Sequence, residues 1–209
     1  MEDLKNELDQ FRIITDALLI DEKERPVSEL IEADELFEKM DLSLNDNGLA
    51  DDQFYNSLKD LVLKTPKTAS AHFFNQLFGG RQNKAVLGDL LAVILNNSMY
   101  TYKVAGPQVG IEKEIIQNVA AKIGYNAQYG GTIAAGGSMN NFMALVMARD
   151  KFNSDIKSKG VSQNLIAYSS KDSHYSNAKN ASFAGIGKDN VRYIPTNDQG
   201  QIIPSEFEK

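Results

Sequence analysis

The residues best placed to do chemistry stand at a glycine-rich turn, Gly136-Gly137-Ser138. Glycine lets the backbone approach a ligand closely, and the free N–H groups in the first turn of a following helix favour an anion. Ser138 adds a hydroxyl donor, so the combination suits a phosphate group. A tight turn in which Ser138 merely caps the helix is an equally good interpretation of these residues taken alone.

A histidine stands in the next polar segment, 169–179. Ser173 can cap a helix there, which would place His174 on its first turn, beside the same sheet edge as the glycine-rich turn. An imidazole in that position could stack on an aromatic ligand or transfer a proton. A lone histidine at a helix start is more often structural or merely exposed. The nearby phosphate-type turn is what makes His174 a candidate.

The more specific glycine motifs of known ligand sites do not match this turn. A dinucleotide fingerprint needs Gly-x-Gly-x-x-Gly, whereas these glycines are adjacent. A nucleophile elbow needs Gly-x-Ser-x-Gly, and Asn140 stands where its last glycine belongs. The sequence also has no P-loop. A serine hydrolase built on Ser138 and His174 is therefore the least favoured enzyme.

The elements that must position both turns alternate along the chain. Short strands are predicted at 132–135, 165–169 and 191–194, with helices at 139–152 and from about residue 174. This order predicts right-handed crossovers and a parallel sheet, hence an α/β fold. Ligands gather at the carboxyl ends of parallel strands, which is where both turns lie.

The preceding part of the chain is predicted to be helical. Buried or half-buried helices are expected over 84–97 and 109–125, after three amphipathic helical segments whose apolar stripes are explained by core or dimer-interface packing. We expect a helical N-terminal segment over 1–83 and the first part of the α/β domain over 84–209. The stripes are Leu4, Leu8, Phe11, Ile14 and Leu18, then Leu30, Ile31, Phe37 and Met40, then Phe54, Leu58, Leu61 and Val62.

The last residues predict a further helix. Ser205 and Glu208 have the spacing of a capping box, yet the sequence stops at Lys209, too soon for a helix to be stable. Three parallel strands would also leave an unprotected sheet edge. We therefore expect this chain to be the front part of a longer protein.

Composition excludes several classes. The 209 residues carry a net charge of −6, and no Lys/Arg cluster is present, which argues against nucleic-acid binding. The acidic start lacks signal-peptide features, and the longest apolar run, 90–95, is too short to cross a membrane. With no cysteine and 2 histidines, thiolate chemistry is absent and a multi-histidine metal centre is nearly excluded. A cytoplasmic protein is expected.

Five segments together resemble the group II pyridoxal-phosphate-dependent amino-acid decarboxylases, above all the glutamate and cysteine-sulfinate decarboxylase branch. They occur in that family's order, cover roughly 71–209, and form a set far more specific than any single member. The segments are His72–Gly80, Asn96–Lys103, Gly136–Asn141, Ser173–Ser176 and Gly185–Glu208.

This resemblance implies a fold-type I transferase architecture, working as a homodimer with pyridoxal 5'-phosphate. Gly137 and Ser138 match the positions that hold the cofactor phosphate. His174 matches the histidine that stacks on the pyridine ring and assists proton transfer.

The resemblance also implies substrate contacts. Gln76 matches a contact to the substrate carboxylate, while Ser98 and Tyr100 match positions lining the side-chain pocket, as in the cysteine-sulfinate branch. The sequence departs from the family pattern at Lys103, where glutamate is usual, and at 105–107, where Ala-Gly-Pro replaces Ala-Pro. Both departures lie by the pocket and leave the choice among glutamate, aspartate and cysteine sulfinate open.

The family's Schiff-base lysine follows a histidine, and an aspartate pairs with the pyridinium nitrogen. Here His72 and His174 precede Phe73 and Tyr175, so no His-Lys pair exists. We expect a fragment of an acidic-amino-acid decarboxylase that is inactive by itself. The alternatives are a fold-type I decarboxylase of a diamino or aromatic amino acid, and a non-catalytic protein that binds a phosphorylated ligand or pairs with a full-length subunit.

Overall fold

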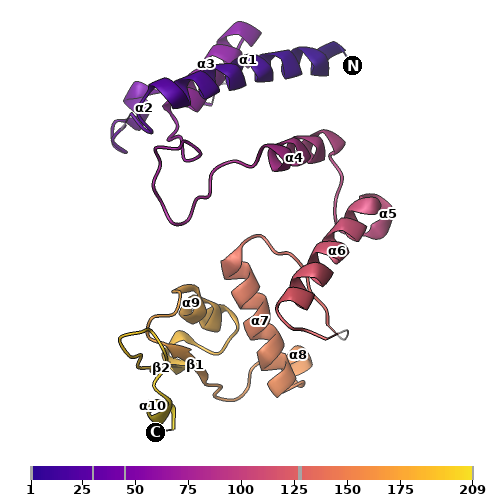
Figure 1. Ribbon diagram of the computed structural model, residues 1–209, viewed down its shortest axis with the longest axis vertical. Coiled ribbons are helices and arrows are strands. Elements are labelled where there is room, and N and C mark those ends of the chain that lie inside the picture. The colour runs from indigo at the N-terminus through magenta and orange to yellow at the C-terminus, as the bar shows by residue number, and fades with distance from the viewer. Residues whose placement is uncertain (1, 30, 45, 127–128, 209) are drawn as a thin grey trace. The chain divides into compact units, whose positions relative to one another are not determined.

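The computed structural model describes residues 2–29, 31–44, 46–126 and 129–208 (Figure 1). The chain divides into two units, Met1–Asn97 and Ser98–Lys209, each with its own internal contacts. The domain division predicted at residues 83 and 84 stays a prediction.

The N-terminal unit is built around two packed helices, α1 (Glu2–Glu24) and α3 (Asp51–Lys64). Ile14 is the buried member of the predicted stripe on α1, and its neighbours on that stripe are partly exposed. The Tyr55 hydroxyl ties the two helices by donating to Glu7 Oε1 at 2.6 Å, which raises the pKa of Tyr55 to about 12.

The second predicted helical stretch is much shorter than its apolar residues suggested. Only α2 (Leu36–Lys39) is helical there, and it contains no buried residue. Leu30 lies outside the described residues. The third stretch forms α3 as predicted and ends before Pro66, because proline removes a backbone donor and restricts the residue before it.

The helix predicted over 84–97 forms as α4 (Asn83–Leu95), but the prediction that it is buried or half-buried is wrong. Its start is capped by the Gln82 side chain, which accepts from the Lys84 N–H at 3.0 Å, and Asn96 ends it with a left-handed φ of 45°. These local interactions explain where the helix begins and ends. Its apolar side chains are exposed, because no described residue encloses them.

The second unit holds a parallel pair of strands with helices packed on it (Figure 1). The strands β1 (Ala167–Ser170) and β2 (Val191–Ile194) pair in register from Ala167 with Val191 to Ser170 with Ile194. Its other elements are α5 (Tyr102–Ala105), α6 (Pro107–Lys122), α7 (Gly137–Phe152), α8 (Ile156–Lys159), α9 (Ser176–Phe183), the 3-10 helix η1 (Lys188–Asn190) and α10 (Pro204–Phe207).

The core of this unit lies between β1, β2 and the helices α7 and α9. Phe142, Leu145 and Val146 of α7 pack against a buried apolar cluster. The cluster consists of Ile156, Leu165, Ala181, Ala184, Ile186 and Val191. Since α9 lies between β1 and β2 in the chain and packs against α7, the strand, helix and strand form the crossover that the sequence predicted.

The prediction of a strand at 132–135 is wrong. Among the described ranges the sheet has two strands, and 132–135 is not one of them. A strand needs a hydrogen-bonded neighbour. No described strand lies beside residues 132–135; the Ile133 N–H donates instead to Glu112 Oε1 at 3.2 Å, and the Thr132 hydroxyl donates to the same oxygen at 3.3 Å. The other two predicted strands exist, one of them shifted to 167–170.

Both helix caps predicted from serine are wrong. The helix after Ser173 begins only at Ser176, so His174 lies before it instead of on its first turn. In α10, Ser205 lies inside the helix and Ile203 occupies the N-cap position. Proline at the first helical position explains this start, because its fixed φ suits that site.

Neither a membrane span nor a metal site is found in the described part of the chain. None of its helices combines the length and apolarity needed to cross a bilayer. The described acidic and histidine side chains form no group of three or more that could ligate a metal ion.

Candidate functional site

The glycine-rich turn has a backbone that only glycine adopts readily. Gly136 has φ 109° and ψ 165°, and α7 begins at the next residue. A Cβ added at Gly136 or Gly137 would meet nothing within 4 Å, so the space beside this backbone is open. The turn therefore exposes main chain to an incoming group.

The first turn of α7 offers unpaired donors to that space. The N–H groups of residues 137–139 have no acceptor among the described residues, as expected for the start of a helix. The Ser138 side chain is exposed, and Gly136 occupies the N-cap position of α7, which disfavours the interpretation that Ser138 is only a helix cap. Backbone donors, a hydroxyl and the positive end of the helix dipole together suit an anion.

A buried amide holds this turn against α9. Asn180, only 4% exposed, donates its Nδ2 to the backbone oxygen of Ser138 at 2.9 Å. Since α7 and α9 also pack along each other, the position of the donor-rich turn depends on contacts between segments far apart in sequence.

His174 is exposed and lies two residues before α9, where its ring accepts a bond from the first N–H of that helix. The Ser176 N–H donates to His174 Nδ1 at 3.2 Å, and the Ser176 hydroxyl lies 2.8 Å from the same nitrogen. A backbone N–H can only donate, so Nδ1 is the acceptor and the neutral ring carries its proton on Nε2. The Tyr175 ring lies beside it, with centroids 4.3 Å apart.

A second amide joins this histidine to α7. Asn141 donates its Nδ2 to the Ser176 hydroxyl at 3.0 Å, and Ser176 is 0% exposed. The chain of bonds from Asn141 through Ser176 to His174 fixes the imidazole relative to the helix whose first turn contains Ser138. The structure thus brings together Ser138 and His174, the two strongest candidates from the sequence.

Sequence reasoning missed the three residues that make this connection. Asn141 and Ser176 lie inside two of the five segments that carried the resemblance, but neither received a role. A signal was present: Asn141 follows Ser138 by three residues, which places both on one face of a helix. Asn180 had no such signal, because its contact depends on how α9 packs.

Ser173 takes part in a different interaction. Its Oγ lies 2.8 Å from Ser169 Oγ and 2.9 Å from Ser170 Oγ, at the carboxyl end of β1. Asn177 adds a longer bond of 3.4 Å to Ser169. Ser173 therefore turns back to the strand end, which explains why it does not cap α9.

The predicted substrate-contacting residues are divided between the two units of the chain. Gln76 is exposed in the first unit, within the segment between α3 and α4. Ser98 and Tyr100 form a turn before α5, where Ser98 Oγ accepts from the Tyr100 N–H at 3.1 Å. No hydrogen bond links this turn to Ser138 or His174 in the described part of the second unit. Their pocket roles stay predictions.

The departure at 105–107, Ala-Gly-Pro, has a clear structural counterpart. Gly106, with φ 56° and ψ −130°, ends α5 and precedes Pro107, the first residue of α6. The extra glycine is thus the junction between two helices, in a conformation that other residues rarely adopt. Lys103 is exposed on α5.

Replacing Ser176 with alanine should loosen the imidazole. The variant lacks the Ser176 hydroxyl, which contacts His174 Nδ1 and accepts from Asn141 Nδ2. The free energy of unfolding should therefore fall by about 1 kcal/mol. The 15N resonance of Nδ1 should also move, and urea unfolding with 15N NMR measures both. Ser182→Ala, at an exposed position of α9, should change neither. A wild-type ring protonated on Nδ1 would contradict the assignment.

Comparison with known proteins gives a family match over most of the chain. The family described as pyridoxal-dependent decarboxylase conserved domain matches residues 34–209. The chain is 33% identical over 204 residues to acidic amino acid decarboxylase GADL1 of Xenopus tropicalis, covering 96% of this chain and 40% of that protein. It is 33% identical over 205 residues to cysteine sulfinic acid decarboxylase of Mus musculus, covering 96% and 41%.

Solved structures show the same relationship. The crystal structure of mouse CSAD in apo form matches with a TM-score of 0.92 and 31% identity over 100% of this chain and 45% of that one. The structure of Oryza sativa TDC with PLP and tryptamine matches with a TM-score of 0.82 and 23% identity over 99% of this chain and 45% of that one, which shows a shared fold. The expected fold class is confirmed, and the chain spans about 40% of the curated relatives it matches.

Proposed function

Because the chain belongs to the pyridoxal-dependent decarboxylase family, we propose that it forms the cofactor-phosphate and ring-stacking part of a decarboxylase of acidic L-amino acids. The complete protein would release carbon dioxide and an amine from glutamate, aspartate or cysteine sulfinate. The single observation that carries the proposal is the donor-rich turn at Ser138, which Asn180 holds against α9 and which Asn141 and Ser176 connect to His174.

The residues of the turn fit a phosphate group. Gly136 and Gly137 leave room for it, and the N–H groups of residues 137–139 together with the Ser138 hydroxyl would donate to its oxygens. A doubly charged anion gains most from a helix N-terminus. These residues would hold the phosphate of pyridoxal 5'-phosphate.

His174 would stack on the cofactor ring and exchange a proton near it. When bound, pyridoxal phosphate supplies an electron sink for the pair of electrons left as carbon dioxide departs. Nδ1 is engaged by Ser176, so Nε2 is the ring nitrogen that gives or takes the proton. The network through Asn141 keeps the ring in one orientation while it does so.

The substrate class rests on the relatives and on residue types. Proteins named for acidic amino acids and cysteine sulfinic acid are about one-third identical to this chain. Gln76 would donate its amide to the substrate α-carboxylate, and Ser98 and Tyr100 would line the side-chain pocket. The structures of aromatic-amino-acid decarboxylases are less similar and support only the fold, which makes that substrate class the weaker alternative.

Catalysis would also require a lysine that forms a Schiff base with the cofactor. The sequence contains no His-Lys pair, so we propose that this chain alone does not decarboxylate amino acids. We propose further that the complete protein is a cytoplasmic homodimer. Activity tests therefore use the complete protein.

The test of function is carbon dioxide release by that protein. At least one of aspartate, glutamate and cysteine sulfinate should be decarboxylated, and only when pyridoxal phosphate is present. Ornithine and tryptophan, as a diamino and an aromatic acid, should not be. Carbon dioxide released only from ornithine or only from tryptophan would show that the substrate is a diamino or an aromatic amino acid instead of an acidic one. Release from none of the five amino acids would overturn the decarboxylase proposal.

Ser138→Ala should weaken cofactor retention about tenfold, since a hydrogen bond to a charged group contributes roughly 1.5–3 kcal/mol. Cofactor absorbance after dialysis measures the amount retained. Ser154→Ala replaces an exposed serine beyond the end of α7 and should retain the cofactor as the wild type does. If Ser138→Ala retained the cofactor as the wild type does, Ser138 would not be a ligand of the phosphate.

A further inference from the structure

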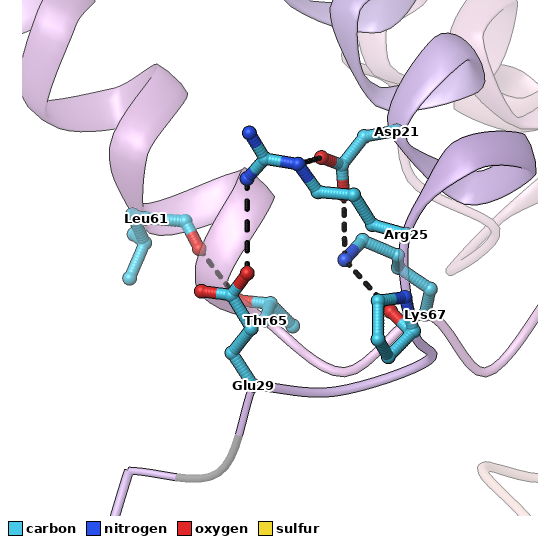
Figure 2. A network of polar contacts seen from close by, with 7 residues as sticks. Asp21, Arg25, Glu29, Leu61, Thr65 and Lys67 are labelled. Carbon is cyan, nitrogen blue, oxygen red and sulfur yellow. Dashed lines mark hydrogen bonds and ion pairs between the residues drawn. The ribbon is translucent and has the colours of Figure 1, made fainter.

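The segment that carries Gln76 begins with a buried ion pair. Lys67 Nζ lies 2.6 Å from Asp21 Oδ2, near the end of α1, and the two side chains are only 2% and 8% exposed (Figure 2). Lys67 Nζ also donates to the Pro26 backbone oxygen at 3.3 Å, and the Lys67 N–H donates to the Val27 oxygen at 2.8 Å. Lys67 is therefore tied to the end of α1 by side chain and backbone together.

The charges around Asp21 form a short chain. Asp21 Oδ1 lies 3.2 Å from Arg25 Nε, and Arg25 reaches Glu29 at 3.8 Å (Figure 2). Asp21 Oδ2 is enclosed and has no partner with hydrogen-bond geometry among the described residues, so its contact to Lys67 is an ion pair. A buried carboxylate of this kind depends on its cation.

The same segment ends in a second ion pair on the next residue of α1. Arg81 pairs with Glu22, whose side chain is 10% exposed. The two ends also approach each other, since a Cβ added at Gly80 would lie 3.9 Å from the Ala69 backbone oxygen. Residues 68–80 are thus a closed loop whose two ends are attached to neighbouring residues of one helix.

Inside the loop, small interactions keep a defined shape. Ser70 O accepts from the Phe73 N–H at 3.0 Å, and Asn75 Oδ1 accepts from the Leu77 N–H at 2.8 Å. The rings of Phe73 and Phe78 meet edge to face, with centroids 5.6 Å apart. Gln76 is exposed between these contacts, so its position depends on where the loop is held.

We propose that Asp21–Lys67 and Glu22–Arg81 are positioning pairs that clamp loop 68–80 and so present Gln76 to the substrate carboxylate. Holding the loop before substrate arrives removes an ordering cost from binding. The two ion pairs hold the loop whatever the activity of the protein is. That they position Gln76 for substrate rests on the proposed function.

The clamp is tested first on the chain of 209 residues by backbone hydrogen exchange. In Arg81→Ala the hydrogen-bonded amides of Phe73 and Leu77 should exchange about tenfold faster, because a charge-assisted bond at the loop end is lost. Arg81→Lys should restore part of the protection. The control Arg12→Ala removes an exposed pair on α1, 3.9 Å from Asp16, and should leave the loop unchanged. Equal exchange in Arg81→Ala and wild type would overturn the clamp.

The positioning role is tested next in the complete enzyme, with the acidic amino acid it decarboxylates. Arg81→Ala should raise KM several-fold while cofactor retention stays at the wild-type level. Adding Gln76→Ala to Arg81→Ala should raise KM less than Gln76→Ala does in the wild type, since both changes act on one contact. Fully additive effects, or an unchanged KM, would overturn positioning. If no amino acid is decarboxylated the proposed function fails, while the exchange result still decides the clamp.

Discussion

Lys67→Met should lower the free energy of unfolding of the N-terminal unit by about 3–5 kcal/mol, the loss expected when a buried charge is left without its partner. In the wild type, Lys67 Nζ and Asp21 Oδ2 are 2.6 Å apart with both side chains nearly enclosed. Methionine keeps most of the apolar stem but leaves Asp21 with Arg25 alone. Urea unfolding followed by circular dichroism measures the change.

Two further variants separate charge pairing from other effects of the substitution. Lys64→Met removes a more exposed pair with Asp60, 2.7 Å apart, and should cost less than about 1 kcal/mol. The double variant Asp21→Asn with Lys67→Met removes both charges and should recover most of the stability, because no unpaired ion remains. A double variant as unstable as Lys67→Met would show that the loss does not come from the unpaired carboxylate.

Gly136→Ala should reduce the affinity of the complete protein for pyridoxal phosphate by about 10–100-fold. The turn holds Gly136 at φ 109° and ψ 165°, a region that costs other residues roughly 1–3 kcal/mol, and each 1.4 kcal/mol corresponds to a factor of ten. The added Cβ would touch nothing within 4 Å, so the effect would come from backbone strain and not from a clash. Strain is relieved if the turn rearranges, which moves the N–H groups away from the phosphate.

The matched control is Gly110→Ala, inside α6, where an added Cβ also meets nothing within 4 Å. Alanine is favoured over glycine in a helix, so this variant should bind the cofactor as the wild type does and be no less stable. Titration with pyridoxal phosphate, followed by absorbance, measures both proteins. If Gly136→Ala bound pyridoxal phosphate with wild-type affinity, the turn would not be part of the cofactor site.

Features governed by neighbouring residues could be predicted from the sequence. The bounds of β2 at 191–194, the helix after the glycine-rich turn and the end of α3 before Pro66 all agree with prediction. Helix periodicity, proline and glycine act within a turn or two of the chain, so their effects are visible in the residues themselves. The alternation of elements likewise indicated the parallel pairing of β1 and β2.

Features governed by distant partners could not be predicted in this way. Residues 132–135 look like a strand, but no described strand pairs with them, and the Ile133 N–H donates to the Glu112 carboxylate instead. The apolar residues of α4 predicted a buried or half-buried helix, yet burial requires another segment to cover it. The cap predicted from Ser173 was wrong because that side chain contacts Ser169 at the end of β1, and the first N–H of α9 donates to His174 instead.

For the candidate site, residue types alone pointed to a phosphate turn at Ser138 and to His174 as its neighbour. Their connection through Asn141, Ser176 and Asn180 follows from the packing of α7 on α9. Asp21 and Lys67 likewise stand far apart in sequence and look like ordinary surface charges until α1 and the segment after α3 enclose them. Burial turns a weak surface attraction into a contact on which the fold depends, and burial is a property of the tertiary structure alone.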